Sequence, residues 1–425
     1  MIAIIGAGIS GLSLGHYLKK NGVNDFVIFE KSDHAGGKIK TDLYEDYFLE
    51  FGPNTLLTTP LLKDLIHELG LEEELVKPSE ESTKNRFIFK NNEVVCLPSS
   101  PSNIFFNSVV GIKSKLSVFK DLRMKPAKVS DFETVSHFFE RHFTKEVVEV
   151  LVKTFCRGIY AANADELMIK TSFPTLVEYE EKYGSILKGI KANTGLEKRE
   201  VISFKKGQSA LVQALASKLA HHIHYSHDIQ SIIEFEKGFL LNGYFKSTAV
   251  VFANEAKSIA KLLKEIKPNT ALALEKVKYS GVQVIHSIYN QNRNKFPYKG
   301  FGILYPPKES DTIFGHIWNS KIFPQFDEDK TIMTTMAAIE ANALDEELDH
   351  CFKSTFGLDK RFLEKRQSMV WKYGIPIYNQ QHFEFLKQNE KENKLNLYIC
   401  SNLLNGVSVP DRIFESKKIA ALLSK

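Results

Sequence analysis

The first thirty residues constrain the fold of this chain more than any other segment. An apolar run, residues 2–5, ends in a turn with the spacing Gly-x-Gly-x-x-Gly, formed by Gly6, Gly8 and Gly11. A helical pattern follows, and a second apolar run ends in Glu30. This order predicts a β-α-β unit that binds a dinucleotide. The glycines permit a tight turn, the approach of a pyrophosphate, and close packing of helix on strand.

The residues around this turn indicate which dinucleotide is bound. The predicted helix begins near Ser10, where free N–H groups and the positive end of the helix dipole favour phosphate. Glu30 lies about twenty residues after the glycines, where an acid accepts hydrogen bonds from ribose hydroxyls. An acid there favours FAD or NAD over NADP, because it would repel a 2′-phosphate. A glycine-rich turn without a ligand is the alternative interpretation.

A second glycine-rich segment separates FAD from NAD. After Lys31 the chain reads Gly36-Gly37-Lys38, and later Gly52-Pro53-Asn54. Paired glycines offer N–H groups to a diphosphate, and a cation adds charge. The segment resembles the extended FAD fingerprint of amine-oxidase-like flavoproteins, in which an arginine usually stands where this chain has lysine. Lysine supplies charge without the bidentate fork. An ordinary loop is the alternative.

Length and composition limit the class of protein. A chain of 425 residues exceeds one hydrophobic core, so two or three domains are expected. The four cysteines show no C-x-x-C pairing, which favours neither disulfides nor zinc and suits a reducing compartment. His221, His222 and His224 lie in a strand pattern that splits their rings between faces, so no metal site is predicted. The chain opens on its first strand, so we expect no signal peptide, and no run predicts a membrane-spanning helix.

Positive charge is concentrated in one segment. The chain has a net charge of +5. Residues 111–130 alone hold six basic residues and one acid, Asp121, which also gives +5. The apolar run Ile104–Val110 precedes them. A basic segment beside an apolar one favours an anionic membrane surface. A solvated helix face is the alternative. The basic residues are Lys113, Lys115, Lys120, Arg123, Lys125 and Lys128.

The order of the elements predicts a mixed α/β fold with α+β insertions. We expect a discontinuous Rossmann-like FAD-binding domain made of residues 1–80, 196–265 and 371–425. Residues 81–195 are assigned to a mainly helical, membrane-associating insertion that also contacts substrate. Residues 266–370 are assigned to a β-rich substrate-binding domain. Insertions of this kind would form a cavity over a flavin ring.

Several local patterns place individual elements. Asn91-Asn92 predicts the turn of a hairpin between strands 86–89 and 94–97. Helices are predicted over residues 131–143, 146–155 and 256–263. Ile229, at the start of a predicted strand 229–235, is assigned to the cofactor-binding set.

Three further stretches carry a more specific resemblance. They contain Asn85-Arg86-Phe, Arg157-Gly158-Ile-Tyr160 and Asn405-Gly406-Val407-Ser408. Together with the N-terminal fingerprint, they resemble the oxygen-dependent protoporphyrinogen oxidase family, the FAD enzymes of the penultimate haem-biosynthesis step, over the whole chain. Two positions depart from the family pattern. Ala162 replaces a glycine, and Lys206 replaces the first of a glycine pair.

The resemblance implies roles for particular residues. It implies that Gly406, Val407 and Ser408 pass the flavin, and that the helix beginning near Asp411 points its positive end at the pyrimidine side. It implies that Arg86 binds a substrate propionate. It also implies that Gly158 and Tyr160 border the tetrapyrrole cavity. A glycine turn and cap without a ligand, a surface arginine and a helix-ending turn are the corresponding alternatives.

The implied function is the FAD-dependent, six-electron oxidation of protoporphyrinogen IX to protoporphyrin IX, with dioxygen as acceptor. No side chain is assigned as a catalytic acid or base, since the flavin carries the chemistry. Coproporphyrinogen III oxidation, an amine oxidase, a carotenoid-type desaturase and a flavin-binding scaffold without turnover are the alternatives. The expected partners are the tetrapyrrole, dioxygen and the inner face of the cytoplasmic membrane, without nucleic acid. A homodimer is left open.

Overall fold

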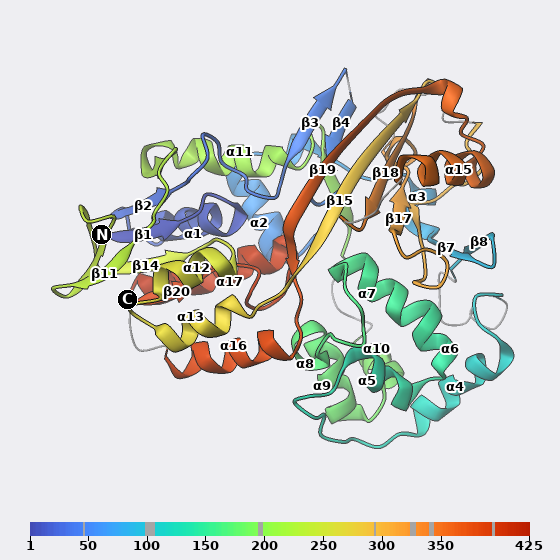
Figure 1. Cartoon of the computed structure of the whole chain (residues 1–425), viewed down its shortest axis with the longest axis horizontal. Helices are drawn as coiled ribbons and strands as arrows, with labels where there is room; N and C mark the ends of the chain where they lie inside the picture. Colours follow the sequence, from blue (N-terminus) through green and yellow to red (C-terminus); the bar gives the residue numbers. More distant parts are fainter. Residues whose placement is uncertain are drawn as a thin grey trace. The chain divides into compact units, whose positions relative to one another are not determined.

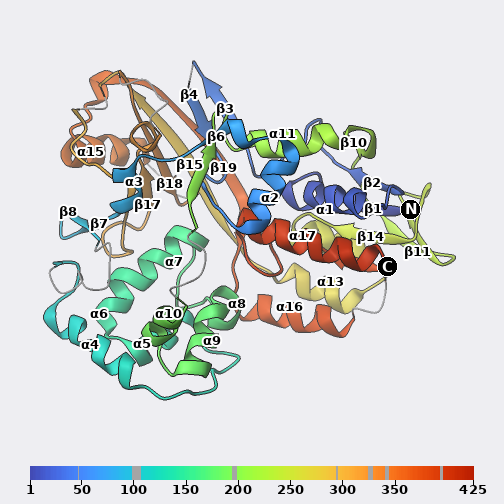
Figure 2. The same cartoon turned by 180° about the vertical axis from the view of Figure 1, so that it is seen from behind.

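The computed structural model describes eight stretches of the chain, residues 1–45, 47–97, 107–193, 199–292, 295–323, 329–339, 344–392 and 396–425. These residues form two compact units, each assembled from separate segments (Figures 1 and 2). Unit one consists of Met1–Val76, Arg199–Lys278 and Gln381–Lys425, and unit two consists of Lys77–Lys198 and Tyr279–Gln380. The finer division into five domain segments stays a prediction.

Unit one contains the predicted β-α-β unit. Its elements are β1 (Ile2–Ile5), α1 (Ile9–Lys20), β2 (Phe26–Phe29), β3 (Thr41–Tyr44), β4 (Tyr47–Glu50), β5 (Leu56–Leu57), α2 (Pro60–Leu69), β6 (Leu75–Val76), β9 (Val201–Phe204), α11 (Ser209–Lys218), β10 (Ile223–His224), β11 (Ile232–Phe235), β12 (Gly238–Leu241), β13 (Phe245–Ser247), β14 (Ala249–Phe252), α12 (Ala256–Leu263), α13 (Pro268–Glu275), α16 (Gln380–Lys391), β20 (Leu397–Ile399) and α17 (Val409–Leu423).

A five-stranded parallel sheet forms the base of unit one, in the order β10-β2-β1-β14-β20. Strands β1, β2 and β14 are completely buried, as their continuous apolar runs require. Parallel strands end at the same edge of a sheet, so the residues that follow each strand come together there. These are Gly6 after β1, Glu30 after β2, Ala253 after β14 and Cys400 after β20.

The C-terminal helix packs directly on the first helix of the chain. The hydroxyl of Ser416 on α17 donates to the carbonyl of Ser10 on α1 at 2.8 Å. Buried apolar residues of both helices, among them Leu12, Leu14 and Ile413, belong to one hydrophobic core with α2 and α11. The first and last segments of the chain therefore share one core, which joins the two sequence motifs expected to hold a cofactor.

Unit two combines a large sheet with a group of helices. Its elements are α3 (Glu80–Lys84), β7 (Phe87–Lys90), β8 (Glu93–Cys96), α4 (Ile112–Arg123), α5 (Val135–His142), α6 (Lys145–Val147), α7 (Lys153–Tyr160), α8 (Ile169–Ser172), α9 (Pro174–Tyr183), α10 (Ile186–Ala192), β15 (Tyr279–Tyr289), β16 (Gly302–Leu304), β17 (Ile313–Ile317), α14 (Asn319–Ile322), β18 (Thr331–Ala337), α15 (Leu344–Phe356) and β19 (Leu363–Pro376).

The sheet of unit two has the strand order β19-β15-β18-β17-β16-β7-β8. Helix α15 packs against it around Trp318, Phe352 and Phe356, in a core rich in aromatic rings. The predicted hairpin is confirmed: β7 and β8 pair antiparallel, and Asn91 and Asn92 have φ of 53° and 62°. Two consecutive left-handed residues suit a tight hairpin turn, and asparagine tolerates that conformation.

Some predicted elements begin or end elsewhere. Helix α5 starts at Val135 rather than at residue 131, because the Thr134 hydroxyl caps it by accepting from the His137 N–H. The helix predicted over 146–155 extends to Tyr160 through a π-helical turn at Val148–Val152. Strand β11 begins at Ile232, so Ile229 precedes it. Strand β19 was not predicted, because its sequence lacks an alternating apolar pattern.

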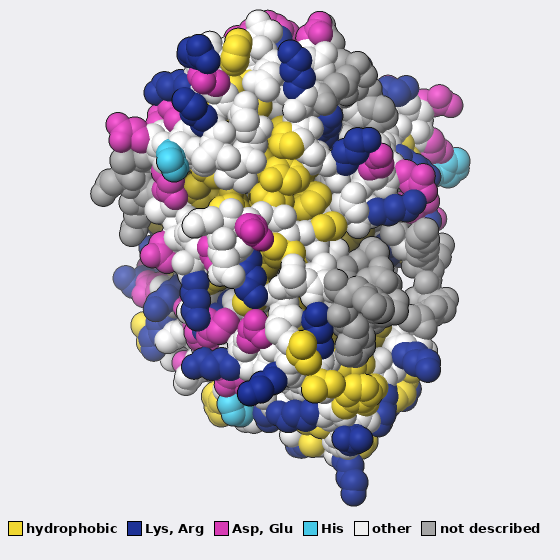
Figure 3. All heavy atoms as spheres, turned by 90° about the vertical axis from the view of Figure 1, so that its right-hand side faces the viewer, with side chains coloured by type: hydrophobic (Ala, Val, Ile, Leu, Met, Phe, Trp, Pro, Cys, Tyr) yellow, Lys and Arg dark blue, Asp and Glu magenta, His cyan; other side chains and the backbone are white. Residues whose placement is uncertain are grey.

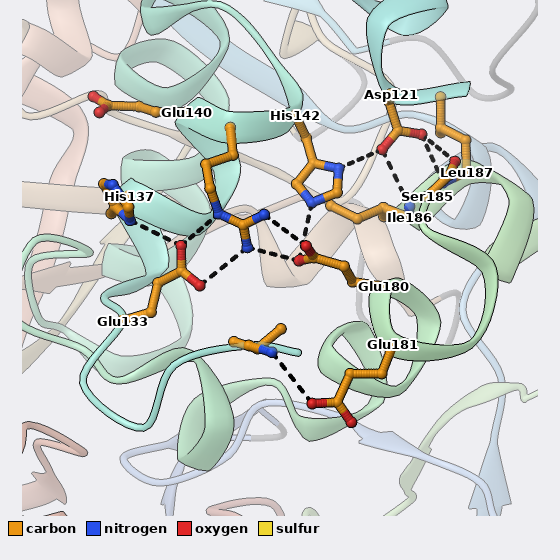
Figure 4. A network of polar contacts seen from close by, with 12 residues as sticks. Asp121, Glu133, His137, Glu140, His142, Glu180, Glu181, Ser185, Ile186 and Leu187 are labelled. Carbon is orange, nitrogen blue, oxygen red and sulfur yellow. Dashed lines mark hydrogen bonds and ion pairs between the residues drawn. The ribbon is translucent and has the colours of Figure 1, made fainter. Parts of the chain in front are cut away.

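A buried polar network ties the helices of unit two together (Figure 4). Asp121 on α4 is fully buried, and its carboxylate contacts Nδ1 of His142 on α5 at 2.6 Å. The same carboxylate accepts from the Ser185 hydroxyl and from the N–H groups of Ile186 and Leu187, at the start of α10. Asp121 therefore anchors three helices at one point.

The network continues through a second acid. Nε2 of His142 lies 3.2 Å from the carboxylate of Glu180 on α9. Arg141 donates to both oxygens of Glu180 at 2.6 and 2.7 Å and to both oxygens of Glu133 at 2.6 and 3.0 Å. Each buried charge thus has an oppositely charged or hydrogen-bonding partner, which is the condition for burying it.

Within the described stretches, no helix combines the length and the apolar character needed to cross a membrane. The segment Ile104–Val110 lies partly outside the described residues, since residues 98–106 are not described.

Candidate functional site

Two glycine loops meet at the carboxyl edge of the sheet in unit one. The Gly36 N–H donates to the Ala7 carbonyl at 2.9 Å, and Gly8 and Gly36 form an isolated parallel bridge. A Cβ on Gly37 would lie 3.2 Å from the Gly8 Cα. A Cβ on Gly11 would lie 1.9 Å from the Gly6 carbonyl oxygen, so the start of α1 can pack there only with glycine. The structure brings together the two phosphate-binding segments that the sequence predicts.

The start of α1 is not capped by any side chain of its own. Gly8 occupies the N-cap position with extended backbone, and the first turn contains no acidic residue. Unpaired N–H groups and the helix dipole at such an end favour an anion. This geometry is the one expected for a diphosphate.

Glu30 lies immediately beyond β2, as predicted. Its two carboxylate oxygens accept from the N–H groups of Ala7 at 2.8 Å and Ser32 at 2.9 Å. These bonds hold the carboxylate beside the first glycine turn. Each carboxylate oxygen has two lone pairs, so both oxygens retain capacity to accept from ribose hydroxyls. Ile229 is buried in a segment that contacts this region through the bond from the His227 N–H to the Glu30 carbonyl.

Two lysines bring positive charge to the second glycine loop. Burial lowers the pKa of Lys38, and Glu255, whose carboxylate lies 3.7 Å from the Lys38 ammonium, partly offsets that effect. The nearby charge of Lys31 lowers the Lys38 pKa further. The predicted cation is thus present in the loop, and part of its charge is balanced by an acid of the chain itself.

The Gly52-Pro53-Asn54 segment is held against this loop. A Cβ on Gly52 would lie 2.1 Å from the Lys38 carbonyl oxygen. The side-chain amide of Gln208 donates to the Asn54 carbonyl at 3.3 Å. Just before this segment, the buried carboxyl of Glu50 accepts from the Gln208 N–H at 2.7 Å and from the Thr41 hydroxyl at 2.9 Å. Glu50 therefore joins the segment to the start of α11.

Replacing Glu50 with glutamine is expected to change how stability depends on pH. Burial raises the pKa of Glu50 from 4.5 to about 8, against the hydrogen bonds from Gln208 and Thr41. A raised pKa means that folding favours the protonated form, so this stabilisation is complete below the unfolded pKa and is lost as pH rises through about 8. Thermal unfolding from pH 5 to about pH 9 should show a decline in the wild type that Glu50→Gln lacks. The control is Glu73→Gln, an exposed acid, and equal declines in all three proteins would contradict the expectation.

The C-terminal motif forms a loop and a capped helix. Gly406 has φ of 102°, and a Cβ there would lie 2.4 Å from the Asp411 carboxylate. Helix α17 begins at Val409, with Ser408 as its cap: the Ser408 hydroxyl accepts from the Asp411 N–H at 3.3 Å, and the Asp411 carboxylate accepts from the Ser408 N–H at 3.1 Å. The helix predicted near Asp411 thus starts two residues earlier. Glycine at 406 is therefore required by this cap, and its assignment to the flavin stays a prediction.

Together these features fit FAD. Two glycine loops leave a cradle of backbone without side chains, and the uncapped end of α1 faces it. Beyond β14, the buried Oδ1 of Asn254 has no hydrogen-bond partner in the described chain. An acid for ribose, a cradle for a diphosphate and a further C-terminal loop all follow strands of one sheet. The assignment of individual residues to FAD stays a prediction.

The residues assigned to substrate lie in unit two. Burial lowers the pKa of Arg86. Its guanidinium lies 4.3 Å above the Phe301 ring and donates to the carbonyls of Ser82, Thr83 and Asn85 at the end of α3. Among the described residues it has no acidic partner within ion-pair distance. A partly desolvated guanidinium in that state is suited to a carboxylate.

Gly158 and Tyr160 are packing residues in this structure. A Cβ on Gly158 would lie 3.1 Å from the Leu304 side chain, so the glycine lets α7 approach β16. Tyr160 is buried, and its hydroxyl donates to the Ser172 carbonyl at 2.8 Å. Ala161, with φ of 49°, ends the helix. Their predicted place at a substrate cavity stays a prediction.

The sequence did not identify Glu50, Gln208 or Asn254 as parts of this site. Asn254 comes just after β14, and a polar residue at the carboxyl end of a buried strand is the signal that could have found it. Gln208 is the N-cap residue of α11, and no local pattern distinguishes it. Nothing local distinguishes Glu50 from a solvated acid. In the described parts of the chain, no group of three or more His, Cys, Asp or Glu residues is placed to hold a metal ion.

Comparison with known proteins agrees with this geometry. Residues 9–349 match the model of the flavin containing amine oxidoreductase family. The chain belongs to this family. It is an FAD-dependent oxidoreductase with the mixed α/β fold of the flavin containing amine oxidoreductases, so the predicted fold class, cofactor and enzyme class are confirmed.

Individual relatives confirm the resemblance stated from the sequence. Protoporphyrinogen oxidase 2 of Arabidopsis thaliana is 28% identical over 99% of this chain and 93% of its own length. The coproporphyrinogen III oxidase of Staphylococcus aureus is 31% identical over 56% of each chain. A solved structure of a candidate protoporphyrinogen oxidase from Exiguobacterium has a TM-score of 0.81 at 18% identity, and it covers 100% of this chain and 98% of that chain.

Proposed function

We propose that the protein oxidises a porphyrinogen to the corresponding porphyrin in haem biosynthesis, with protoporphyrinogen IX as substrate and dioxygen as acceptor. The extent of the similarity carries this proposal. Protoporphyrinogen oxidases of Arabidopsis and cattle each match 99% of this chain. The similarity to the coproporphyrinogen III oxidase covers 56%. Coproporphyrinogen III is therefore the second candidate, supported by the higher identity of 31% within that part.

The chemistry divides between cofactor and protein. When bound, FAD supplies two-electron oxidation, so three rounds remove six electrons and six protons from a porphyrinogen while three dioxygen molecules become three hydrogen peroxide molecules. Glu30 and the two glycine loops hold the dinucleotide, and Asn254 offers a buried acceptor beside them. Arg86 binds a propionate and orients the macrocycle. No side chain is required to act as a general acid or base.

The direct test is anaerobic mixing of the FAD-loaded protein with each porphyrinogen. Bleaching of the flavin absorbance is expected with protoporphyrinogen IX, and more slowly with coproporphyrinogen III. Porphyrin fluorescence should appear once air is admitted, because the six-electron oxidation needs three rounds of flavin reoxidation. Faster bleaching with coproporphyrinogen III would reverse the order of the two candidates. Rapid reduction by an amine or a carotenoid precursor, with none by either porphyrinogen, would reject the proposal.

Replacing Arg86 with alanine is expected to raise KM more than it lowers kcat. Loss of a charge-assisted hydrogen bond costs ~1.5–3 kcal/mol, which corresponds to roughly ten- to a hundred-fold in kcat/KM. Arg86→Lys should retain part of the affinity, since it keeps the charge but not the planar fork. The control is Arg361→Ala, an exposed arginine of unit two that also stacks on a phenylalanine. An unchanged KM in Arg86→Ala would remove this residue from the site.

We also propose that unit two attaches the protein to the inner, cytoplasmic face of an anionic membrane through α4. The polar side chains of this helix face inward and its apolar side chains face solvent. Ser114, Ser117 and Asp121 are buried, whereas Ile112, Leu116 and Phe119 are 76%, 53% and 48% exposed. The buried polar face is satisfied inside unit two, for example by the bond from the Ser114 hydroxyl to Glu146 at 2.6 Å. An exposed apolar stripe of this kind marks a surface that binds a partner or a membrane.

The positive charge around this apolar stripe indicates what binds to it. Lys113, Arg123, Lys125 and Lys128 are exposed, and the one acid of the segment, Asp121, is buried. The exposed surface of residues 111–130 is therefore entirely basic in formal charge. In Figure 3, hydrophobic side chains gather among lysines and arginines in the lower part of the surface shown. Apolar side chains within a basic rim suit the headgroup region of anionic phospholipids.

Replacing Leu116 with serine is expected to weaken vesicle binding. Removing one leucine from an apolar contact costs ~1.5–3 kcal/mol, or roughly ten- to a hundred-fold in partition coefficient. Co-sedimentation with vesicles containing phosphatidylglycerol, at low and high salt, gives the measurement. Leu272→Ser, at a leucine 55% exposed in unit one, is the control. Equal binding by all three proteins would reject α4 as the docking surface. If the wild type does not bind vesicles and is a dimer, whereas Leu116→Ser is a monomer, the stripe is instead an interface with a second copy of the chain.

A further inference from the structure

Arg412 on α17 is a buried cation with an unusual set of partners. Its side chain is 3% exposed. Its two terminal nitrogens donate to the carbonyls of Ser401 and Leu404, and its Nε has no hydrogen-bond partner. No described carboxylate lies within ion-pair distance of it. A guanidinium keeps its charge in proteins, and burying it without an acid is costly. Such an arrangement calls for a role beyond stability.

The carbonyls that Arg412 holds belong to the loop between β20 and α17. A third carbonyl of the same loop, that of Leu403, accepts from Nε2 of the buried His382 at 2.8 Å. Burial lowers the pKa of His382 to about 4, so this ring is neutral at physiological pH. Three carbonyls in four residues are therefore directed to the interior, toward side chains of α16 and α17.

The following residues present N–H groups instead. Asn405 and Gly406 have φ of 55° and 102°, so two consecutive residues are left-handed. The Asn405 side chain donates to the buried Glu415 at 2.6 Å, which fixes its position. Within the described chain, the N–H groups of Asn405, Gly406 and Val407 have no hydrogen-bond acceptor. Successive unpaired N–H groups in a turn form a concavity that binds an anion or a carbonyl oxygen.

We propose that Arg412 is a positioning residue for FAD: by holding the carbonyls of Ser401 and Leu404, it keeps the N–H groups of residues 405–407 directed at the electron-rich pyrimidine end of the flavin. The inference rests on the proposed assignment of Gly406, Val407 and Ser408 to the flavin. Arg412 acts through the loop and does not touch the reacting atoms. Reduction places negative charge on the pyrimidine end, so the aligned N–H groups stabilise the reduced flavin more than the oxidised form.

The test compares Arg412→Met and Arg412→Lys with the wild type. Loss of the two carbonyl contacts should raise the dissociation constant for FAD, measured by titration of apoprotein, roughly ten- to a hundred-fold in Arg412→Met. The flavin midpoint potential should become more negative, by about 30 mV for each tenfold loss of preference for the reduced form. Arg412→Lys, which has one nitrogen for two carbonyls, should be intermediate. Lys418→Met, at an exposed lysine of the same helix, should match the wild type.

Two outcomes would overturn the inference. One is Arg412→Met apoprotein that melts at a lower temperature yet binds FAD with unchanged affinity and potential, since Arg412 would then stabilise the fold alone. Should Arg412→Met fail to fold, unchanged affinity and potential in Arg412→Lys would overturn the inference equally. Glu30→Ala separates this from the proposed FAD site. If Glu30→Ala weakens FAD binding and the Arg412 variants do not, the site stands and the role of Arg412 fails.

Discussion

Asp121→Ala is expected to destabilise unit two by about 3–5 kcal/mol, because it leaves several buried hydrogen-bonding groups without the carboxylate that they contact. The substitution leaves His142 without its carboxylate at Nδ1 and removes the acceptor of the Ile186 and Leu187 N–H groups at the start of α10. Hydrogen exchange in α4, α5 and α10 should accelerate at least ~100-fold, because Asp121 joins these three helices at one buried point. Glu140→Ala, at an exposed acid on α5, is the control.

The stability that this network gives to the wild type is expected to depend on pH. Burial raises the pKa of Asp121, but the hydrogen bonds from His142, Ser185 and Leu187 outweigh it and hold the pKa below its ordinary value. The pKa of Glu180 is lowered in the same way, with bonds from Arg141 and His142 outweighing burial. The stabilisation is therefore present above the ordinary carboxyl pKa values and lost as pH falls through the lowered ones. Wild-type exchange rates that approach those of Asp121→Ala only in acid would agree, and equal rates at neutral pH would contradict the network.

Gly8→Ala is expected to weaken FAD binding at least ~100-fold while leaving the apoprotein folded. Gly8 has an ordinary φ of −76°, and a Cβ there would meet only the Gly37 Cα, at 3.9 Å. The fold therefore tolerates alanine, with a stability change within about ±0.5 kcal/mol. A methyl group at that position would occupy the path of the pyrophosphate. Titration of apoprotein should show a loss of at least ~100-fold in affinity, about 2.7 kcal/mol.

Gly11→Ala provides the contrast. Its Cβ would lie 1.9 Å from the Gly6 carbonyl oxygen, so the apoprotein itself should be destabilised. The two glycines of one motif thus separate a requirement of the ligand from a requirement of the fold. FAD affinity in Gly8→Ala equal to that of the wild type would show that the diphosphate does not approach this turn.

Local patterns predicted the parts of the fold that depend on neighbouring residues. The apolar runs of β1 and β2, the glycine spacing before α1 and the Asn91-Asn92 turn all appear where the sequence placed them. Each is decided within a few residues, by strand burial, backbone conformation or turn geometry. The predicted first residues of α5 and α17 are wrong for a related reason. Each helix begins directly after its cap residue, whereas the apolar pattern suggests a different start.

The sequence by itself determined the cofactor class, since Gly6, Gly8, Gly11 and Glu30 are a local code for a dinucleotide. Only the tertiary structure decided where particular charges lie. From the sequence, Asp121 is the lone acid of a basic segment that looks solvated. In the structure it is buried, because the fold brings it to His142, 21 residues away, and to the start of α10, more than 60 residues away. Burying that polar face turned the apolar face of α4 outward. Arg412 likewise acquires its role from a loop that packing brings to it, because partners of buried charges are set by the fold and not by sequence distance.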